Sequence, residues 1–212
     1  MTHRIRALVF LAAIASLAAI GTASAQAESL HSESATTFLA GEQIGTNTWD
    51  FGAVSAKCTT ATFLGQVSGT TTEEVEVTPT YSGCTAAGVA ETTDINGCKY
   101  QVTWSDKIVH IKCPKILGVT QEIEHTLKNC TITTPEQTYP FTNKNIGTGT
   151  SRDIEFTPSP TANFKYFVKY PGEIKFGCGT AGEHTDGHYT GSTTIKGYSD
   201  EARTKQVGIF IE

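Results

Sequence analysis

Methionine, basic clusters and long apolar runs are all scarce in this sequence. Its 212 residues include one methionine, Met1, so a core built from the rest of the chain lacks the flexible thioether that fills irregular gaps. Beyond residue 20 no long apolar run occurs, and no segment shows a sustained 3.6-residue period with caps. These absences argue against a helical bundle and, once residues 1–25 are removed, against a membrane span.

The N-terminus has the layout of a secretory signal. His3, Arg4 and Arg6 give a short positive region, and residues 7–20 form an uncharged apolar run of 14 residues. A membrane-spanning helix needs about 20 such residues, and here a small-x-small cleavage site, Ala23–Ala25, follows instead. We therefore expect residues 1–25 to be a signal peptide and the protein to be secreted, with residues 26–35 as a flexible lead-in.

The remaining chain is mildly acidic. Without Arg4 and Arg6 it has 14 Lys and Arg against 21 Asp and Glu, which gives a net charge of −7. The basic residues do not cluster, so the sequence argues against nucleic acid as a partner and leaves an extracellular ligand or surface of unknown chemistry.

Six cysteines in an exported chain predict three disulfides. No C-x2-C spacing occurs among them, which argues against a structural zinc site, and bonded cysteines cannot serve as nucleophiles. Residues 98–104 and 108–113 read as a hairpin in which opposed residue numbers sum to 211, and this register places Cys98 opposite Cys113. The other four cysteines allow three pairings, which the sequence alone does not decide. Because Cys58 and Cys84 bracket the preceding strand pair, we favour Cys58–Cys84, which leaves Cys130 with Cys178.

Short strand-like runs separated by Gly, Pro, Asn and Asp recur from residue 36 to the C-terminus. In residues 74–78, for example, acids and valines alternate between two faces. The best helix candidate, 117–127, is ambiguous because it contains Gly118 and several β-branched residues. The pattern predicts an all-β domain over 36–212, a disulfide-stapled β-sandwich of many short antiparallel strands, with two sub-regions possible on either side of residue 114. The clearest strands are expected at 58–67, 74–81, 98–104, 108–113, 152–157, 163–170, 188–195 and 206–211.

One short motif could bind a metal ion. If the segment is extended, His184, Asp186 and His188 lie on one side, and imidazole and carboxylate ligands together suit zinc or another transition metal. Against this, Asp186-Gly187 is a common turn pair, and a turn would break the alignment. The turn is the stronger interpretation, so we expect no cofactor. His125, which follows Glu122 and Glu124, is expected to belong to a solvated charged patch.

No arrangement of residues identifies an enzyme. The sequence has no G-x-S-x-G elbow, and nothing singles out a pair of carboxylates among the 21 acids. An aromatic platform for sugar rings is conceivable, although alternating aromatic residues in strands more often fill a core. The residues that could form it are Trp49, Trp104, Tyr166, Phe167 and Tyr170.

Six short segments carry a family resemblance: Cys58–Phe63, Thr78–Cys84, Asn96–Tyr100, Asn129–Thr131, Gly147–Gly149 and Asp186–Gly191. Together they resemble a family of uncharacterised, secreted, cysteine-containing all-β proteins of soil actinobacteria. The resemblance spans about residues 36–212, and the cysteine frame is its most specific part. It implies export, disulfides and an all-β fold, and it supplies no catalytic residue.

The sequence therefore predicts a secreted, non-enzymatic binding or structural protein of unknown ligand. The alternatives are a glycan-binding module and a hydrolase of extracellular polymers with an unrecognised site. Rigid cross-linked β folds carry recognition on their loops, which here are rich in Thr, Gly and Asn.

Overall fold

The structure is a computed structural model that describes residues 27–172 and 176–212. The predicted signal peptide, 1–25, lies outside the described residues. Within them the fold is all-β, as expected, and a 3-10 turn at Gly149–Ser151 is the only helical element. The described part of the chain has no helix with the length and apolar character that crossing a bilayer requires. The strands are β1 Leu30–Ser32, β2 Thr36–Asp50, β3 Ser55–Ser68, β4 Thr71–Thr72, β5 Glu74–Ala86, β6 Val89–Ala90, β7 Thr92–Asp94, β8 Lys99–Thr103, β9 Ile108–Lys112, β10 Lys115–Ile116, β11 Val119–Thr120, β12 Ile123–Thr126, β13 Thr131–Thr134, β14 Gln137–Ile146, β15 Asp153–Pro158, β16 Phe164–Lys169, β17 Gly182–Tyr198, β18 Gln206–Val207 and β19 Ile209–Ile211.

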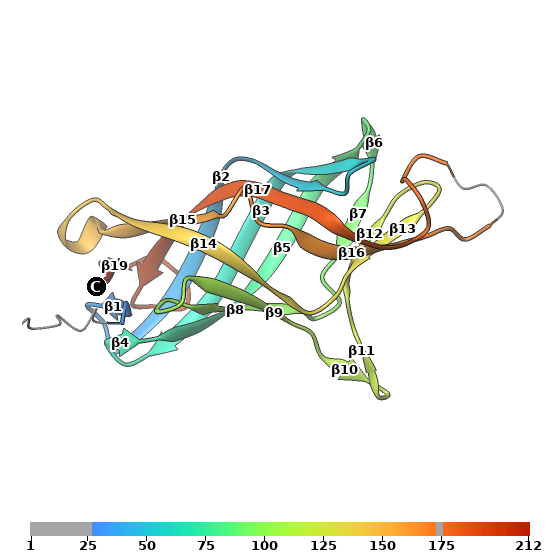
Figure 1. Cartoon of the computed structure of the whole chain (residues 1–212). Helices are drawn as coiled ribbons and strands as arrows, with labels where there is room; N and C mark the ends of the chain where they lie inside the picture. Colours follow the sequence, from blue (N-terminus) through green and yellow to red (C-terminus); the bar gives the residue numbers. More distant parts are fainter. Residues whose placement is uncertain (1–26, 173–175) are drawn as a thin grey trace, which may run out of the picture.

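Eight strands close into a barrel, which corrects the expected sandwich of two sheets. The strand order is β15-β14-β9-β8-β5-β3-β2-β17, and pairing of β15 with β17 at Ile154–Phe156 completes the circle (Figure 1). The physical reason is strand length. β2, β3, β5 and β17 contain 15, 14, 13 and 17 residues, and long twisted strands let one sheet curl until its edges meet.

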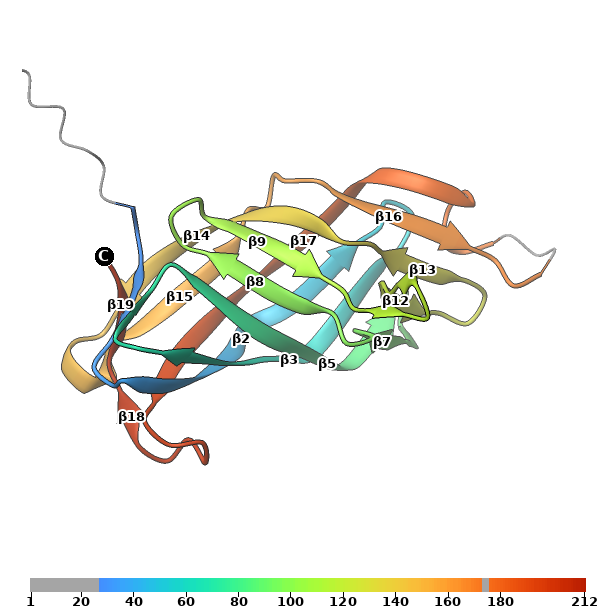
Figure 2. The same ribbon diagram turned by 90° about the horizontal axis from the view of Figure 1, so that it is seen from below.

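The strand β17 belongs to two parts of the molecule. Near its C-terminal end, Thr193–Ile195 pairs with β15 in the barrel, whereas Gly182–Gly187 pairs with β16. From β16 the sheet continues through β13 and β12 to β7, and these strands form an extension at one end of the barrel (Figures 1 and 2). We call β7, β12, β13 and β16 the end sheet. At the opposite end of the barrel β1 pairs with β19 and β4.

Buried side chains of the barrel and of the elements at its two ends form two core clusters. The first, the aliphatic cluster, lies toward β1 and β19 and contains Leu30, Leu39, Val67, Val75, Val77, Val102, Trp104, Val109, Phe141, Ile154, Ile209 and Ile211. The second, the aromatic cluster, lies toward the end sheet and contains Trp49, Phe51, Val54, Ala56, Cys58, Ala61, Tyr81, Cys84, Ala86, Cys98, Ile111, Ile123, Cys130, Ile132, Tyr139, Phe164, Tyr166, Val168 and Cys178.

The three disulfides have the predicted partners. Lys99 faces Lys112 and Tyr100 faces Ile111, so the hairpin has the predicted register and Cys98 bonds to Cys113. Cys58 and Cys84 are opposed residues of β3 and β5, and Cys130 bonds to Cys178. Five of these six cysteines belong to the aromatic cluster and Cys113 packs against it, so all the cross-links lie toward one end of the barrel.

Three regions that the sequence left ambiguous or flexible have regular strand structure. Within 26–35, where a flexible lead-in is expected, residues 30–32 form β1. Strands β9 and β14, which lie on either side of residue 114, pair directly. The ambiguous segment 117–127 is not helical, because it supplies β11, β12 and the turn of the hairpin β10–β11, which projects from the body in Figure 1.

Candidate functional site

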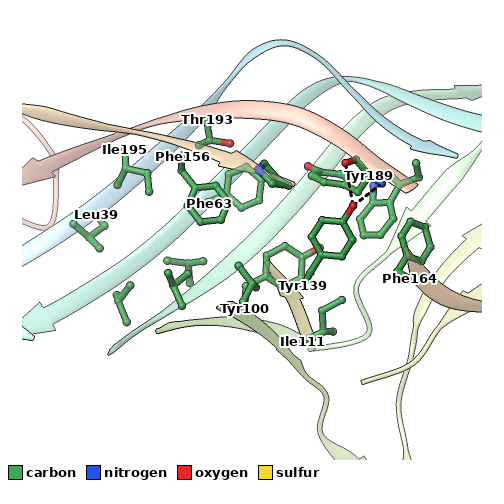
Figure 3. Close-up of a pocket in the computed structure, with 17 residues that line it drawn as sticks. Leu39, Phe63, Tyr100, Ile111, Tyr139, Phe156, Phe164, Tyr189, Thr193 and Ile195 are labelled. Carbon is green, nitrogen blue, oxygen red and sulfur yellow. Dashed lines mark hydrogen bonds between the residues drawn. The ribbon is translucent and has the colours of Figure 1, made fainter. Parts of the chain in front are cut away.

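A cavity of about 80 Å³ lies inside the barrel, between the two core clusters. An eight-stranded barrel is just wide enough for side chains to fill its interior or for one small ligand to be held there. The lining side chains come from facing strands and point toward a common space (Figure 3). They are apolar or aromatic apart from Thr193, and no charged residue is among the described residues of the wall. Prominent in the wall are Trp49, Phe63, Tyr100, Tyr139, Phe156 and Tyr189.

Incomplete filling of the barrel explains the cavity. Phe63, Tyr100, Phe156 and Ile195 point inward from their strands but are only half-buried, whereas most inward residues of the two clusters are buried. Gly41, also in the wall, contributes no side chain. A Cβ at Gly41 would lie 2.9 Å from Thr193 Cγ2 and 3.1 Å from Phe63 Cβ, so the positions of those two side chains require glycine.

Tyrosine hydroxyls gather on the side of the cavity that faces the aromatic cluster. The Tyr139 hydroxyl lies 2.9 Å from the backbone carbonyl oxygen of Ser159 and 2.8 Å from that of Ala162. Its oxygen also accepts from the Tyr189 N–H at 3.3 Å (Figure 3). The hydroxyls of Tyr81 and Tyr100 are 2.9 Å apart. The cavity therefore has an apolar wall with a few convergent polar atoms, which is the usual character of a small-molecule site.

Burial determines the ionisation of these tyrosines. It is the largest cause that raises the pKa of Tyr81, Tyr100 and Tyr189 above the ordinary value, and for Tyr81 the neighbouring hydroxyls of Tyr100 and Tyr189 add to the effect. Burial also raises the pKa of Tyr139. The hydroxyls are therefore neutral across the physiological range, and the cavity wall carries no charge.

A β-bulge in β2 supplies the amides that support Tyr189. The register with β3 shifts between Glu42 and Asn47, and this brings the Asn47 amide within 2.6 Å of Gln43 Oε1. Tyr189 OH donates to Asn47 Oδ1. Gly191 leaves room for that side chain, because a Cβ at Gly191 would lie only 2.1 Å from Asn47 Oδ1. The bulge and the glycine together fix the tyrosine hydroxyl.

A second buried polar group, which sequence reasoning missed, lies in the aromatic cluster. His125 was expected in a solvated patch, but its side chain is fully buried against the rings of Trp49 and Phe51. Thr93 Oγ1 lies 2.9 Å from Glu91 Oε1 and 3.2 Å from His125 Nδ1. His125 is buried although its neighbours are acidic, because successive residues of a strand point to opposite faces and His125 follows Glu124 in β12.

The only cluster of potential metal ligands among the described residues does not suit a metal. It consists of Cys58, Cys84 and Glu91, and the two sulfur atoms are already bonded to each other. A disulfide offers no thiolate, which is the form of cysteine that binds metal ions.

The structure does not bring His184, Asp186 and His188 together. All three lie in β17, so the favoured turn at Asp186-Gly187 is absent, yet His184 and Asp186 both contact Tyr166 whereas His188 contacts a different segment. His184 stacks on Tyr166, with ring centroids 4.9 Å apart, Asp186 accepts from Tyr166 OH at 3.1 Å, and His188 Nδ1 lies 3.2 Å from the Ala162 oxygen. The ligand atoms of the three residues do not form a metal-sized cluster.

The aromatic residues considered for a sugar platform are mostly core residues. Trp49, Trp104 and Tyr166 are each at most 3% exposed, so they cannot form a surface platform with Phe167 and Tyr170. A second hollow, of about 390 Å³, lies on the outside near Asp50 and Lys57, the only charged residues among the described ones that line it. It is lined mainly by glycines and short side chains, and we take the interior cavity as the candidate site.

Comparison with known proteins adds no relative. A scan against models of protein families, a search of curated proteins and a search of solved structures each found no match to this chain.

Proposed function

We propose that this protein is a secreted, non-enzymatic binding protein that holds one small apolar molecule inside its barrel. The observation that carries the proposal is the uncharged cavity between the two core clusters, with tyrosine hydroxyls on one side. Eight-stranded barrels can hold a small ligand in this position.

Protein interiors are normally close-packed, so an unfilled cavity has an energetic cost. A residual cavity destabilises a core by about 24 cal/mol per Å³, so about 80 Å³ of empty space corresponds to roughly 2 kcal/mol. One or two larger side chains at half-buried positions such as Ile195 would remove that penalty. If a ligand fills the cavity in the working protein, side chains no larger than Ile195 at these positions are explained.

The composition of the wall supports binding rather than catalysis. The described residues that line the cavity include no carboxylate, histidine or cysteine, and its tyrosines are neutral because burial raises their pKa values. General acid–base chemistry needs a group that changes protonation near the working pH. The three disulfides, which suit an oxidising compartment, together with the signal-like N-terminus support secretion.

Ligand-induced stabilisation of the intact secreted protein tests this proposal. Toluene is the probe, and we expect the melting temperature to rise with its concentration, because a ligand that binds only the folded state stabilises it by mass action. The substitution Ile195→Phe places a larger side chain at the cavity and should abolish the rise.

The matched control is Ile44→Phe, at a position that is 47% exposed on β2. It makes the same chemical change outside the cavity and should leave the toluene effect intact. No stabilisation of the unsubstituted protein by toluene, xenon or phenol would overturn the proposal. So would an equal response of the two variants.

A further inference from the structure

The outer hollow near Asp50 and Lys57 is separate from the interior cavity. It holds about 390 Å³, a volume typical of small-molecule sites, and the two share none of their described lining residues. Three segments surround it: the β2–β3 loop at 50–55, the β5–β6 turn at 87–88 and the loop that contains Gly177. The β5–β6 hairpin lies at the end of the barrel that carries the end sheet (Figure 1).

The floor of the outer hollow is tied to the core by a disulfide. Lys57 and Thr85 are opposed residues of β3 and β5, and each lies next to a cysteine of the Cys58–Cys84 bond. Both cysteines are buried in the aromatic cluster, whereas Lys57 and Thr85 are exposed on the other face of the sheet. A cross-linked pair of strands therefore presents two polar side chains at fixed positions.

The loop on the far side of the hollow is tied down in the same way. Cys178 follows Gly177 and bonds to Cys130 of the aromatic cluster. The backbone here approaches the β2–β3 loop so closely that a Cβ at Gly179 would lie 3.1 Å from Ala53 Cβ. Loops that a rigid scaffold positions in this way are where binding residues are concentrated.

Four polar side chains line the hollow on one face of the sheet. Asp50 opposes Ser55 across β2 and β3, and Lys57, two residues beyond Ser55, opposes Thr85. Asp50 Oδ1 accepts from the Gly52 N–H at 3.0 Å, which fixes the carboxylate. None of the ion pairs among the described residues includes Asp50 or Lys57, so both charges are available to a ligand.

The chemistry of this floor favours a neutral ligand with several hydroxyl groups. A carboxylate accepts hydrogen bonds, an ammonium group donates them, and the hydroxyls of Ser55 and Thr85 do both. The single acid and the single base balance, so the floor attracts neither a cation nor an anion. An apolar molecule would remove the four polar side chains from water without replacing their hydrogen bonds, which is costly.

Two exposed apolar side chains adjoin the hollow. Val89, which follows the lining residue Gly88, is 52% exposed, and Phe176, which precedes Gly177, is 76% exposed. A sugar ring has hydroxyl groups around its edge and C–H groups on its two faces. Polar groups on the floor and apolar groups at the margin therefore match the two kinds of surface that a sugar presents.

We propose that the outer hollow is a second binding site and that it binds a neutral sugar, whose hydroxyl groups bond to Asp50, Lys57 and Thr85. An α-amino acid could place its ammonium group at Asp50 and its carboxylate at Lys57. It would leave the two hydroxyl side chains and the apolar margin unused, so the sugar is the better match. The site is additional to the interior cavity and does not depend on a ligand there.

Nuclear magnetic resonance of the intact, isotope-labelled secreted protein tests the proposal. The probes are glucose, cellobiose and N-acetylglucosamine, with L-alanine as the zwitterion. We expect the sugars to shift the backbone amide resonances of Gly52 and Gly88, which line the hollow, and not those of Gly118 and Gly149, which do not. Tighter binding of cellobiose than of glucose would assign the site to a chain of sugars, and equal affinities would assign it to a single ring.

Thr85→Val and Lys57→Met each remove one hydrogen-bonding group and keep most of the side chain. Both positions are exposed, so the variants should fold. We expect the affinity for the sugar that binds most tightly to fall about threefold to tenfold in each, which is the size of one net hydrogen bond. The matched control is Thr80→Val, the same change at an exposed position of β5 outside the hollow, and it should leave the affinity unchanged.

Three results would overturn the proposal. The first is that no sugar shifts the resonances of Gly52 and Gly88, and the second is that L-alanine shifts them and no sugar does. The third is an equal loss of affinity in Thr85→Val and Thr80→Val, because the effect would then not arise in the hollow. The toluene test of the interior cavity is unaffected by any of these results, since the two sites share none of their described lining residues.

Discussion

The two core clusters differ in the kinds of side chain that fill them. The aliphatic cluster consists of Leu, Ile and Val with two aromatic residues, and it contains no cysteine. The aromatic cluster contains five cysteines, two phenylalanines next to Trp49, several tyrosines and, packed against its rings, the buried His125. Branched aliphatic side chains fill space with few rotamers, whereas rings and polar groups must also satisfy geometry and hydrogen bonds.

The comparison indicates why the cavity lies where the clusters meet. Phe63 and Tyr100 pack against both clusters and are half-buried at the boundary. On one side an aliphatic core requires nothing but volume, and on the other the tyrosine positions are set by Asn47 and by backbone carbonyls. The side chains at the junction meet both requirements only incompletely, which leaves a cavity between the two clusters.

Loss of a disulfide at the aromatic end should give the largest effect. Cys130 and Cys178 are 48 residues apart, and closing a loop of that length stabilises the folded state by about 4 kcal/mol in the chain-entropy model. We expect the double variant Cys130→Ala/Cys178→Ala to lose stability of this order in urea denaturation. Cys98→Ala/Cys113→Ala, with a separation of 15, should lose about 3 kcal/mol.

Ile154→Ala is the control from the other end of the barrel. Ile154 is fully buried in the aliphatic cluster, and its truncation should cost about 2–5 kcal/mol. Its effect on stability should be the same with and without the Cys130–Cys178 bond, because the clusters are distinct. Unequal effects in the two backgrounds would show that the ends do not behave as separate units.

Alkaline pH should destabilise the protein through the tyrosines of the aromatic end. Burial raises the folded-state pKa of Tyr81, Tyr100 and Tyr189, while the unfolded chain has tyrosine pKa values of about 10. Above pH 10 the unfolded chain loses these protons and the folded protein keeps them, so the free energy of unfolding falls as pH rises. Below about pH 10 this contribution is fully present.

Urea denaturation between pH 8 and 11, combined with ultraviolet titration of tyrosine, measures this effect. The steep part of the curve should begin near pH 10, and Tyr81→Phe/Tyr100→Phe should be less steep. The matched control, Tyr198→Phe, removes a tyrosine that lies in neither cluster. A folded protein in which all seven tyrosines ionise together near pH 10 would contradict the prediction.

The pairing of neighbouring strands could be predicted from sequence patterns, but the closure of the sheet into a barrel could not. The register that opposes Cys98 to Cys113 also places Tyr100, Val102, Val109 and Ile111 on one face, and all four line the cavity. Alternation in a hairpin is a local property, so it is visible in the chain. Which strands close the barrel depends on long-range pairing, such as that of β15 with β17, which no local pattern encodes.

The polar part of the candidate site was missed for the same reason. Asn47 and Tyr189 are 142 residues apart, and they meet because β2 pairs with β17 and carries a bulge. Gly45 and Gly191 permit the bulge and the close approach of Asn47, and nothing in the local sequence marked them for that role. His125 was misplaced because charged neighbours dominate the local composition, whereas the pleat of β12 determines burial. The ligand atoms of His184, Asp186 and His188, the weaker interpretation of that motif, were not brought together.

The smallest effect is expected in the hairpin β10–β11, which belongs to neither cluster. Leu117 and Gly118 form its two-residue turn with φ values of 51° and 84°, and Leu117 is fully exposed. A left-handed backbone is unfavourable for leucine, whereas Asn-Gly suits a turn with two positive φ values. Leu117→Asn should therefore raise stability by about 1 kcal/mol, or roughly 2–4 °C in melting temperature for a domain of this size.

Val119→Asn is the control for this prediction. Val119 is 64% exposed in the neighbouring strand, so the substitution also removes an exposed apolar side chain but relieves no left-handed backbone. Asparagine is disfavoured in strands, and we expect no gain in stability from this variant. Stabilisation by both variants would assign the effect to solvation of the apolar turn, and stabilisation by neither would mean that the turn tolerates leucine without strain. Stabilisation by Leu117→Asn without stabilisation by Val119→Asn would show that the effect arises in the backbone of the turn, which lies outside both core clusters.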